Sequence, residues 1–186
     1  MMIDKFQLKA PALLIAVPQL ADPNFFRALV LLVEHSEEGS MGLVINRPIE
    51  LSMGEFCKSQ EMYCRSDRSQ SLYQGGPVQT DRAFILHKSG QMGPETEEVF
   101  DGICLSYSLE SVTMLVEEPP LDMNVCVGYA GWGPDQLVEE VTSGSWLVTY
   151  PEEDLLFSIA SDAAWEHSLN QMGIAPLQLM HSGAVH

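Results

Sequence analysis

The chain has 186 residues, the length expected of one domain that spans residues 1–186. Hydrophobic residues make up 46% of it and charged residues 19%, which is a globular composition and excludes a disordered chain. No apolar run approaches the roughly 20 residues that a membrane-spanning helix needs, so we expect a protein with no membrane segment.

Charge is distributed unevenly along the chain. Nine basic and 26 acidic residues give a net charge of −17, but all nine basic residues and only ten acids lie in residues 1–88. Residues 89–186 hold sixteen acids and no Lys or Arg. Proteins bind nucleic-acid phosphates largely through basic side chains, so direct nucleic-acid binding is disfavoured. An acidic surface instead attracts basic partners.

Short apolar runs bounded by turn-forming residues predict a strand-rich fold with several strands buried on both faces. The predicted strands are Ala12–Val17, Leu29–His35, Gly42–Asn46, Ser71–Gln74, Ala83–His87, Ile103–Tyr107, Asn124–Tyr129 and Ser145–Thr149, with a shorter one at Leu155–Phe157. The short connection between the second and third of these strands fits a hairpin.

Helical spacing of apolar residues occurs in fewer places. The predicted helices are Ser52–Met62, Leu109–Glu117, Asp135–Val141 and Asp162–Met172. Strands and helices do not alternate regularly, and the first three strands are separated only by turns. This order predicts an α+β fold with a mixed or antiparallel sheet.

The four cysteines form no C-x-x-C pair and have no His at zinc-finger spacing. Cys57 and Cys64 are seven residues apart and would share one face of a helix. We interpret the four cysteines as small buried hydrophobic residues in a reducing cytoplasm, in preference to a disulfide or a metal site. We therefore predict a cytoplasmic protein with no cofactor and no metal.

Familiar catalytic and nucleotide-binding motifs do not occur in the sequence. It has no G-x-G-x-x-G, no P-loop, no G-x-S-x-G and no H-E-x-x-H. His181 and His186 lie in what we expect to be a frayed tail. These absences favour a protein that is not an enzyme, without deciding the question.

Four segments combine strand ends with glycine, proline or polar residues in unusual order. They are Gly42–Pro48, Tyr73–Val78, Asp81–His87 and Gly128–Leu137. In this order, and together with Asp22–Phe25, they resemble the AlgH/YqgE family of bacterial proteins, whose members are labelled uncharacterised or transcriptional regulators. The resemblance covers nearly the whole chain. It implies a bent, split sheet that curls into a pseudo-barrel with a few helices packed outside.

Polar and glycine residues of these segments and of the first hairpin are the candidates for a binding groove. They are His35, Asn46, Arg47, Gly75, Gly76 and Trp132. Each also has a structural interpretation, because glycines specify backbone shape, an arginine can form an ion pair, and a tryptophan can anchor a core. No catalytic residue is assigned.

We predict a monomeric, non-enzymatic regulator that binds a protein or small-molecule partner. The alternative is an enzyme that uses His35 or His87 as general base and Arg47 to hold an anionic substrate. A third hypothesis takes the family's regulator label literally, as direct DNA binding. The charge distribution argues against this third hypothesis.

Overall fold

Most of the apolar runs form strands of one ten-stranded sheet in the computed structural model, which describes residues 7–88 and 93–181. The strands are β1 Ala12–Ala16, β2 Leu29–Ser36, β3 Gly39–Val44, β4 Pro48–Ser52, β5 Ser71–Gln74, β6 Val78–Lys88, β7 Thr96–Phe100, β8 Ile103–Ser106, β9 Met123–Trp132 and β10 Trp146–Thr149. The helices are η1 Pro23–Phe25, α1 Met53–Ser59, α2 Leu109–Glu117, α3 Gln136–Thr142, α4 Asp154–Phe157, α5 Ser161–Gln171 and α6 Pro176–His181.

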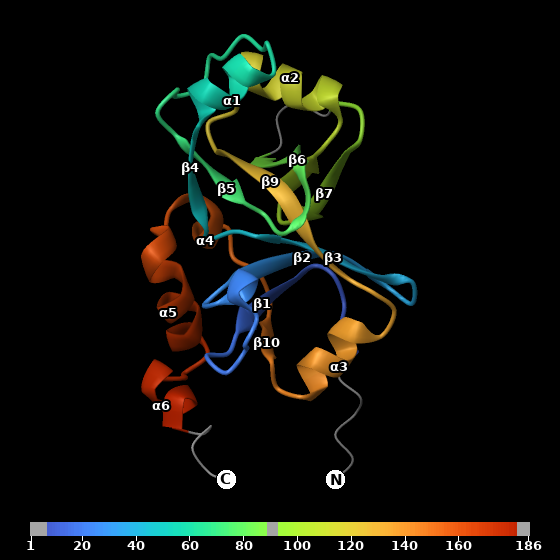
Figure 1. Cartoon of the computed structure of the whole chain (residues 1–186), viewed down its shortest axis with the longest axis vertical. Coiled ribbons are helices and arrows are strands. Elements are labelled where there is room, and N and C mark those ends of the chain that lie inside the picture. Colours follow the sequence, from blue (N-terminus) through green and yellow to red (C-terminus); the bar gives the residue numbers. More distant parts are fainter. Residues whose placement is uncertain (1–6, 89–92, 182–186) are drawn as a thin grey trace.

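The sheet is mixed and largely antiparallel. Its main path runs β10-β1-β2-β3-β9-β6-β8-β7, and β5 pairs with β4 and, in parallel, with β9. It curls into a half-barrel with helices packed outside, so the predicted α+β fold class is confirmed (Figure 1). In this view α1, α2 and β4–β8 form an upper half, and β1–β3, β10, α3, α5 and α6 form a lower half.

Strand β9 joins the two halves. Its first residues pair with β6, from Met123 opposite His87 to Val127 opposite Ala83. Its last residues, Ala130–Trp132, pair with β3. Between the two stretches lies Gly128 with a φ of +74°, a conformation that glycine adopts without steric cost. Tyr129 is still paired with Val78 of β6, so the long strand changes its partner from β6 to β3 just after this glycine.

Three apolar clusters fill the space around the sheet. The strand β1 is buried along its whole length because it contributes to two of them. Leu13 and Ile15 face the central cluster, which α4 and α5 cover, whereas Leu14 and Ala16 face a second cluster beside α3. The third cluster lies between α1, α2 and the upper part of the sheet. This confirms the prediction of strands buried on both faces.

Several boundaries differ from the predictions for identifiable reasons. Leu155–Phe157 was expected as a strand and is part of α4, because a helical turn lets both Leu155 and Leu156 reach the core. The strands β4 and β7 were missed, since they are short edge strands without an apolar run. His181 ends α6 and does not belong to a frayed tail, and His186 lies outside the described residues.

Candidate functional site

Asn46 and Arg47, two of the candidate groove residues, lie where β3 leads into β4. The side chains of both form hydrogen bonds with backbone atoms. The side chain of Asn46 accepts a hydrogen bond from Leu29 N (2.9 Å) and donates one to Arg27 O (2.9 Å). The guanidinium of Arg47 donates one hydrogen bond to the carbonyl of Asn24 in η1 and another to the carbonyl of Phe26, the C-cap of η1 (2.8 Å). These contacts fix the connection between β1 and β2. We call the two residues and this connection the Arg47 corner.

A small hollow of about 180 Å³ adjoins the Arg47 corner. Arg27, Trp165 and Glu166 are among its lining residues. The guanidinium carbon of Arg27 lies 4.9 Å from the ring centroid of Trp165, a cation–π contact. Both arginines of the hollow and Asn46 are therefore engaged with the protein itself.

Trp132 lies beyond the predicted strand Asn124–Tyr129 but is the last residue of β9, and it is only 6% exposed. Its indole N–H donates to Glu140 Oε2 (3.0 Å), and the indole of Trp146 donates to the same oxygen (2.8 Å). The Phe25 ring stacks on it at 6.1 Å between centroids. Trp132 anchors a core, which is the structural interpretation considered above.

The glycine pair Gly75-Gly76 lies where the backbone leaving β5 passes β9. A Cβ on Gly75 would lie 2.3 Å from Gly128 O, and one on Gly76 would lie 2.1 Å from the carbonyl carbon of Tyr129. Gly75 also hydrogen-bonds through N–H to Val127 O (2.9 Å) and through C=O to Val44 N (2.7 Å). These glycines permit a close approach of two backbones.

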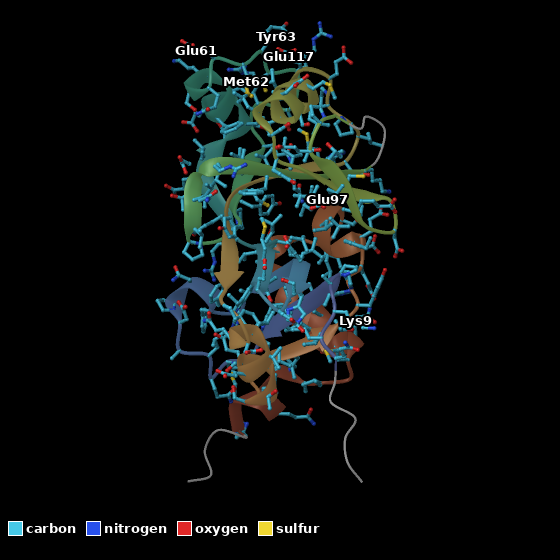
Figure 2. The ribbon with its side chains drawn as sticks, turned by 90° about the vertical axis from the view of Figure 1, so that its right-hand side faces the viewer. Lys9, Glu61, Met62, Tyr63, Glu97 and Glu117 are labelled. Atoms are coloured by element: carbon cyan, nitrogen blue, oxygen red, sulfur yellow. The ribbon has the colours of Figure 1, made fainter. Side chains whose placement is uncertain are left out.

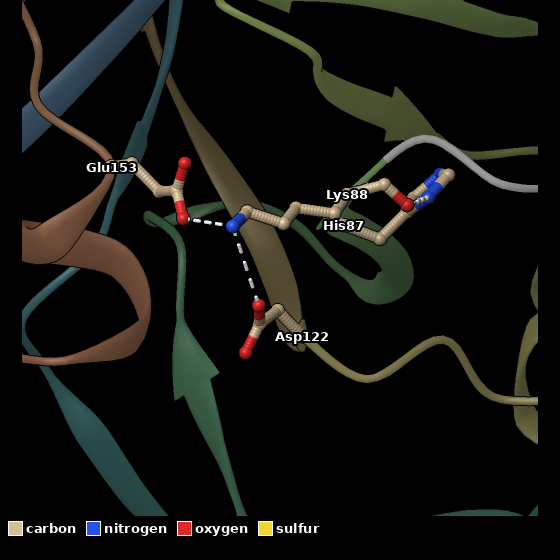
Figure 3. A network of polar contacts seen from close by, with 4 residues as sticks. All are labelled: His87, Lys88, Asp122 and Glu153. Carbon is tan, nitrogen blue, oxygen red and sulfur yellow. Dashed lines mark hydrogen bonds and ion pairs between the residues drawn. The ribbon is translucent and has the colours of Figure 1, made fainter.

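The two candidate histidines are both hydrogen-bonded to serine. His35 Nδ1 lies 2.6 Å from Ser40 Oγ at the β2–β3 hairpin. His87 is fully buried, its Nε2 lies 2.9 Å from Ser106 Oγ, and burial lowers its pKa. Its ring points away from the side chain of its neighbour Lys88 (Figure 3). Because Ser106 is also fully buried, this His–Ser pair does not face a substrate pocket.

Of the candidate groove residues, the structure thus places Asn46 and Arg47 at one corner and the others at separate positions in the sheet. His35 pairs with Ser40 across the hairpin, and Ser40 pairs with Trp132, so His35 and Trp132 lie in one row of the sheet. Trp132 is buried, and Gly76 is packed against backbone. The candidate residues therefore do not line the single groove that the sequence suggested.

A different cleft lies on the side of the sheet near β7. It consists of two adjoining hollows of about 230 and 310 Å³ that share Arg82 and Tyr107 as lining residues. We call them together the Tyr107 cleft. Apolar side chains line much of it. In the first hollow these are Val33, Met41, Phe84, Leu105 and Tyr129, and in the second Phe56, Met62, Ala83, Leu109 and Val112.

Carboxylates from two separate segments, β2 and the start of β7, converge on this cleft. Burial raises the pKa of the Tyr107 hydroxyl, and the negative charges of Glu97, Glu95 and Glu34 raise it further. Glu97, on the edge strand β7, lies on the flank of the molecule in Figure 2. In residues 7–88 and 93–181, no Lys or Arg forms an ion pair with these three glutamates. The cleft therefore carries unpaired negative charge over an aromatic surface.

One cation belongs to the cleft. The guanidinium carbon of Arg82 lies 5.6 Å from the ring centroid of Phe84, and its Nη1 donates to Gln79 Oε1 (3.2 Å). These two contacts hold the arginine against the strand that carries it. Its charge lowers the pKa of Tyr107, opposite to the effect of the glutamates.

The backbone beside the cleft is irregular. The pairing of β6 with β9 shifts register between Val78 and Ala83, and Gln79 within this bulge has a φ of +47°. Glu95 has a φ of +54°. Left-handed non-glycine residues and bulges cost free energy and occur often at functional sites.

The sequence predictions missed this cleft because they placed no element at residues 95–101 and considered His87, not the rest of Asp81–His87, as a functional group. A charge-bearing strand at 96–100 would have been the useful signal. Among the residues described, no group of three or more His, Cys, Asp or Glu is placed to hold a metal ion. None of the described helices is long and apolar enough to cross a membrane.

Comparison with known proteins gives a consistent result. A family model described as AlgH-like matches residues 13–177. A UPF0301 protein of Myxococcus xanthus is 42% identical over 92% of this chain and 94% of its own length, and one of Pseudomonas putida is 38% identical over 93% of both chains.

Solved structures agree with this assignment. The solution structure of the AlgH protein from Pseudomonas aeruginosa superposes with a TM-score of 0.74 at 35% identity, covering 94% of each chain. A crystal structure of a protein from Corynebacterium diphtheriae, 21% identical and covering 92% of this chain and 94% of its own, shares the fold with a TM-score of 0.70. The chain belongs to the AlgH-like family.

Proposed function

We propose that this protein is a non-enzymatic regulatory domain of the cytoplasm whose Tyr107 cleft binds a basic segment of a partner protein. The observation that carries the proposal is the convergence of Glu34, Glu95 and Glu97 on an aromatic cleft without a paired cation. Regulation then proceeds through a protein contact, which is how we interpret the regulator label given to members of the family.

The chemistry of the cleft suits a Lys or Arg side chain. Carboxylates attract the charged group, while aromatic faces such as Tyr107 and Tyr129 accept the apolar stem and contribute cation–π attraction. Arg82 repels a second cation beside it and so favours one orientation of the incoming segment. The net charge of −17 brings basic partners toward the molecule.

Contacts made by the basic residues argue against direct DNA binding. Arg47 donates to backbone carbonyls, and Arg27, Arg65 and Arg82 lie over aromatic rings. Lys88 is paired with Glu153 and, at 3.7 Å, with Asp122 (Figure 3). A phosphate backbone would have to compete with these contacts.

The enzyme hypothesis loses support on the same grounds. Arg47 is engaged with the backbone of the Arg47 corner. His35 is hydrogen-bonded to Ser40 at the β2–β3 hairpin, away from this corner both in the sequence and in the sheet. Turnover of a metabolite that is abolished by both His35→Ala and Arg47→Ala, in variants that remain folded, would reinstate it.

Binding of a short oligolysine peptide, measured by calorimetry at two salt concentrations, tests the proposal. We expect binding that weakens with salt and that falls at least about tenfold in the triple variant Glu34→Gln, Glu95→Gln, Glu97→Gln. A matched control, Glu50→Gln, Glu117→Gln, Glu139→Gln, removes the same charge from exposed positions elsewhere. Tyr107→Ala should weaken binding without any change of charge.

Two results would overturn the proposal. One is equal loss of peptide binding in the triple variant and its control, which would reduce the effect to net charge. The other is binding of duplex DNA that persists at physiological salt and is independent of the cleft.

A further inference from the structure

Two of the four cysteines lie close together outside the cleft already described. Cys57 is on α1 and fully buried, and Cys64 packs against the same apolar cluster while half exposed. The chain turns back between them, because Met62 N donates to Cys57 O (2.8 Å) and Glu61 has a φ of +55°. The two thiols are near enough that Cys64 raises the pKa of Cys57.

The two thiols differ in reactivity. Burial, followed by the contact with Cys64, raises the pKa of Cys57 to about 12, so Cys57 is a thiol at neutral pH. Cys64 is the more exposed of the two, and its Sγ donates to Ser66 O over 3.7 Å. Oxidants therefore reach Cys64 first, and Cys57 is the thiol positioned to react with the oxidised Cys64.

We propose that Cys57 and Cys64 are a redox-active pair that closes to a disulfide when a peroxide oxidises Cys64. In the first step the Cys64 thiol loses its proton, the thiolate attacks one peroxide oxygen and breaks the O–O bond, and Cys64 becomes a sulfenic acid while the departing hydroxide takes up that proton as water. In the second, Cys57 attacks the Cys64 sulfur, loses its proton and displaces a second water. The protein gives up two electrons and two protons, and hydrogen peroxide becomes two molecules of water.

Two features of the surroundings bear on the second step. Burial opposes the Cys57 thiolate, and the positive charge of Arg68 lies close enough to offset part of that effect. The backbone between the two cysteines is also open to adjustment, since Glu61, Met62 and Tyr63 lie at one end of the molecule and Tyr63 is 67% exposed (Figure 2). Disulfide geometry requires the two Cα atoms to lie within about 7 Å, which small movements of such a turn can supply.

Titration of the folded protein with hydrogen peroxide, followed by alkylation and intact mass measurement, tests this proposal. We expect alkylable thiols to fall from four to two, a mass loss of about 2 Da before alkylation, and a peptide that links Cys57 to Cys64. A dithiol reductant should restore all four thiols. Cys104 and Cys126, both buried on β8 and β9, serve as internal controls and should stay reduced.

The variant Cys64→Ser replaces the half-exposed member and should keep the fold, as circular dichroism can verify. In it we expect no intramolecular disulfide and at least about tenfold slower loss of thiols. The proposal is overturned if wild-type Cys64 accumulates as sulfenic or sulfinic acid without linking to Cys57. It is equally overturned if Cys64→Ser oxidises as fast as the wild type, or if the linked peptide contains other cysteines.

Discussion

The Arg47 corner and the Tyr107 cleft both place arginine and aromatic side chains beside a hollow, yet they differ in what the polar groups contact. In the corner, Asn46 and Arg47 bind backbone atoms of the same chain, and each is part of the folded framework. In the cleft, glutamates from separate segments gather around Tyr107 without a cation in ion-pair contact.

This difference teaches how to weigh a polar residue at a strand end. A side chain that hydrogen-bonds to backbone groups of its own chain stabilises the fold. Removing that side chain leaves those backbone groups without a hydrogen-bond partner. Like charges brought together cost free energy, and a fold that keeps them has a use for them that its own stability does not explain. The predictions below separate the two kinds of residue.

The largest effect is expected where backbone passes backbone. Gly76→Ala would place a Cβ about 2 Å from the backbone of Tyr129, so we expect the free energy of unfolding to fall by about 3 kcal/mol or more, measured in urea. Gly133→Ala is the control, because its Cβ would meet only one side-chain atom at 3.9 Å, and it should change stability by less than about 0.5 kcal/mol. Equal losses would contradict the packing argument.

The two arginines give the most direct comparison of corner with cleft. Arg47→Met removes the donors to η1 and should cost about 2 kcal/mol, whereas Arg82→Met removes one cation–π contact and should cost about 0.5 kcal/mol. For peptide binding the order should be reversed, with Arg47→Met neutral and Arg82→Met altering affinity. A stability loss in Arg82→Met as large as in Arg47→Met would remove the distinction.

A smaller, pH-dependent effect is expected at His87. Burial lowers its pKa in the folded state, so the unfolded chain binds a proton more readily. Its contribution to stability is complete above the unfolded pKa of about 6.5 and is lost as pH falls through the lower folded pKa. Urea unfolding between about pH 8 and 5 should show this loss. The His87→Asn variant should show a shallower dependence, and an unchanged slope would argue against a buried neutral imidazole.

The smallest effect on stability is expected in the cleft itself. Glu97→Gln relieves like charge near Tyr107, so the free energy of unfolding should change by less than about 0.5 kcal/mol in either direction. The pKa of Tyr107 should move down toward its ordinary value, which ultraviolet titration compared with a Tyr107→Phe variant can isolate. An unchanged Tyr107 pKa would mean that Glu97 does not act on the hydroxyl.

Much of the fold follows from local sequence, and much of the site does not. The strand Ser71–Gln74 and the helix Leu109–Glu117 were predicted to the residue, because apolar periodicity and turn residues mark both ends. The role of Arg47 was not predictable, since its acceptors are carbonyls more than twenty residues away. The same holds for the Tyr107 cleft, where Glu34 on β2 and the glutamates at β7 are brought together only by the strand order β2-β3-β9-β6-β8-β7.

Strand β9 has a consequence for how the molecule comes apart. Because it is paired at once with β3, β5 and β6, neither half of the sheet in Figure 1 can lose its partners without breaking the other. Amide protons of Val125 and Ala130, on opposite sides of the bend at Gly128, should therefore exchange with solvent at the same slow rate, set by global opening. One continuous strand makes the two halves a single cooperative unit, so that damage to either is felt by both.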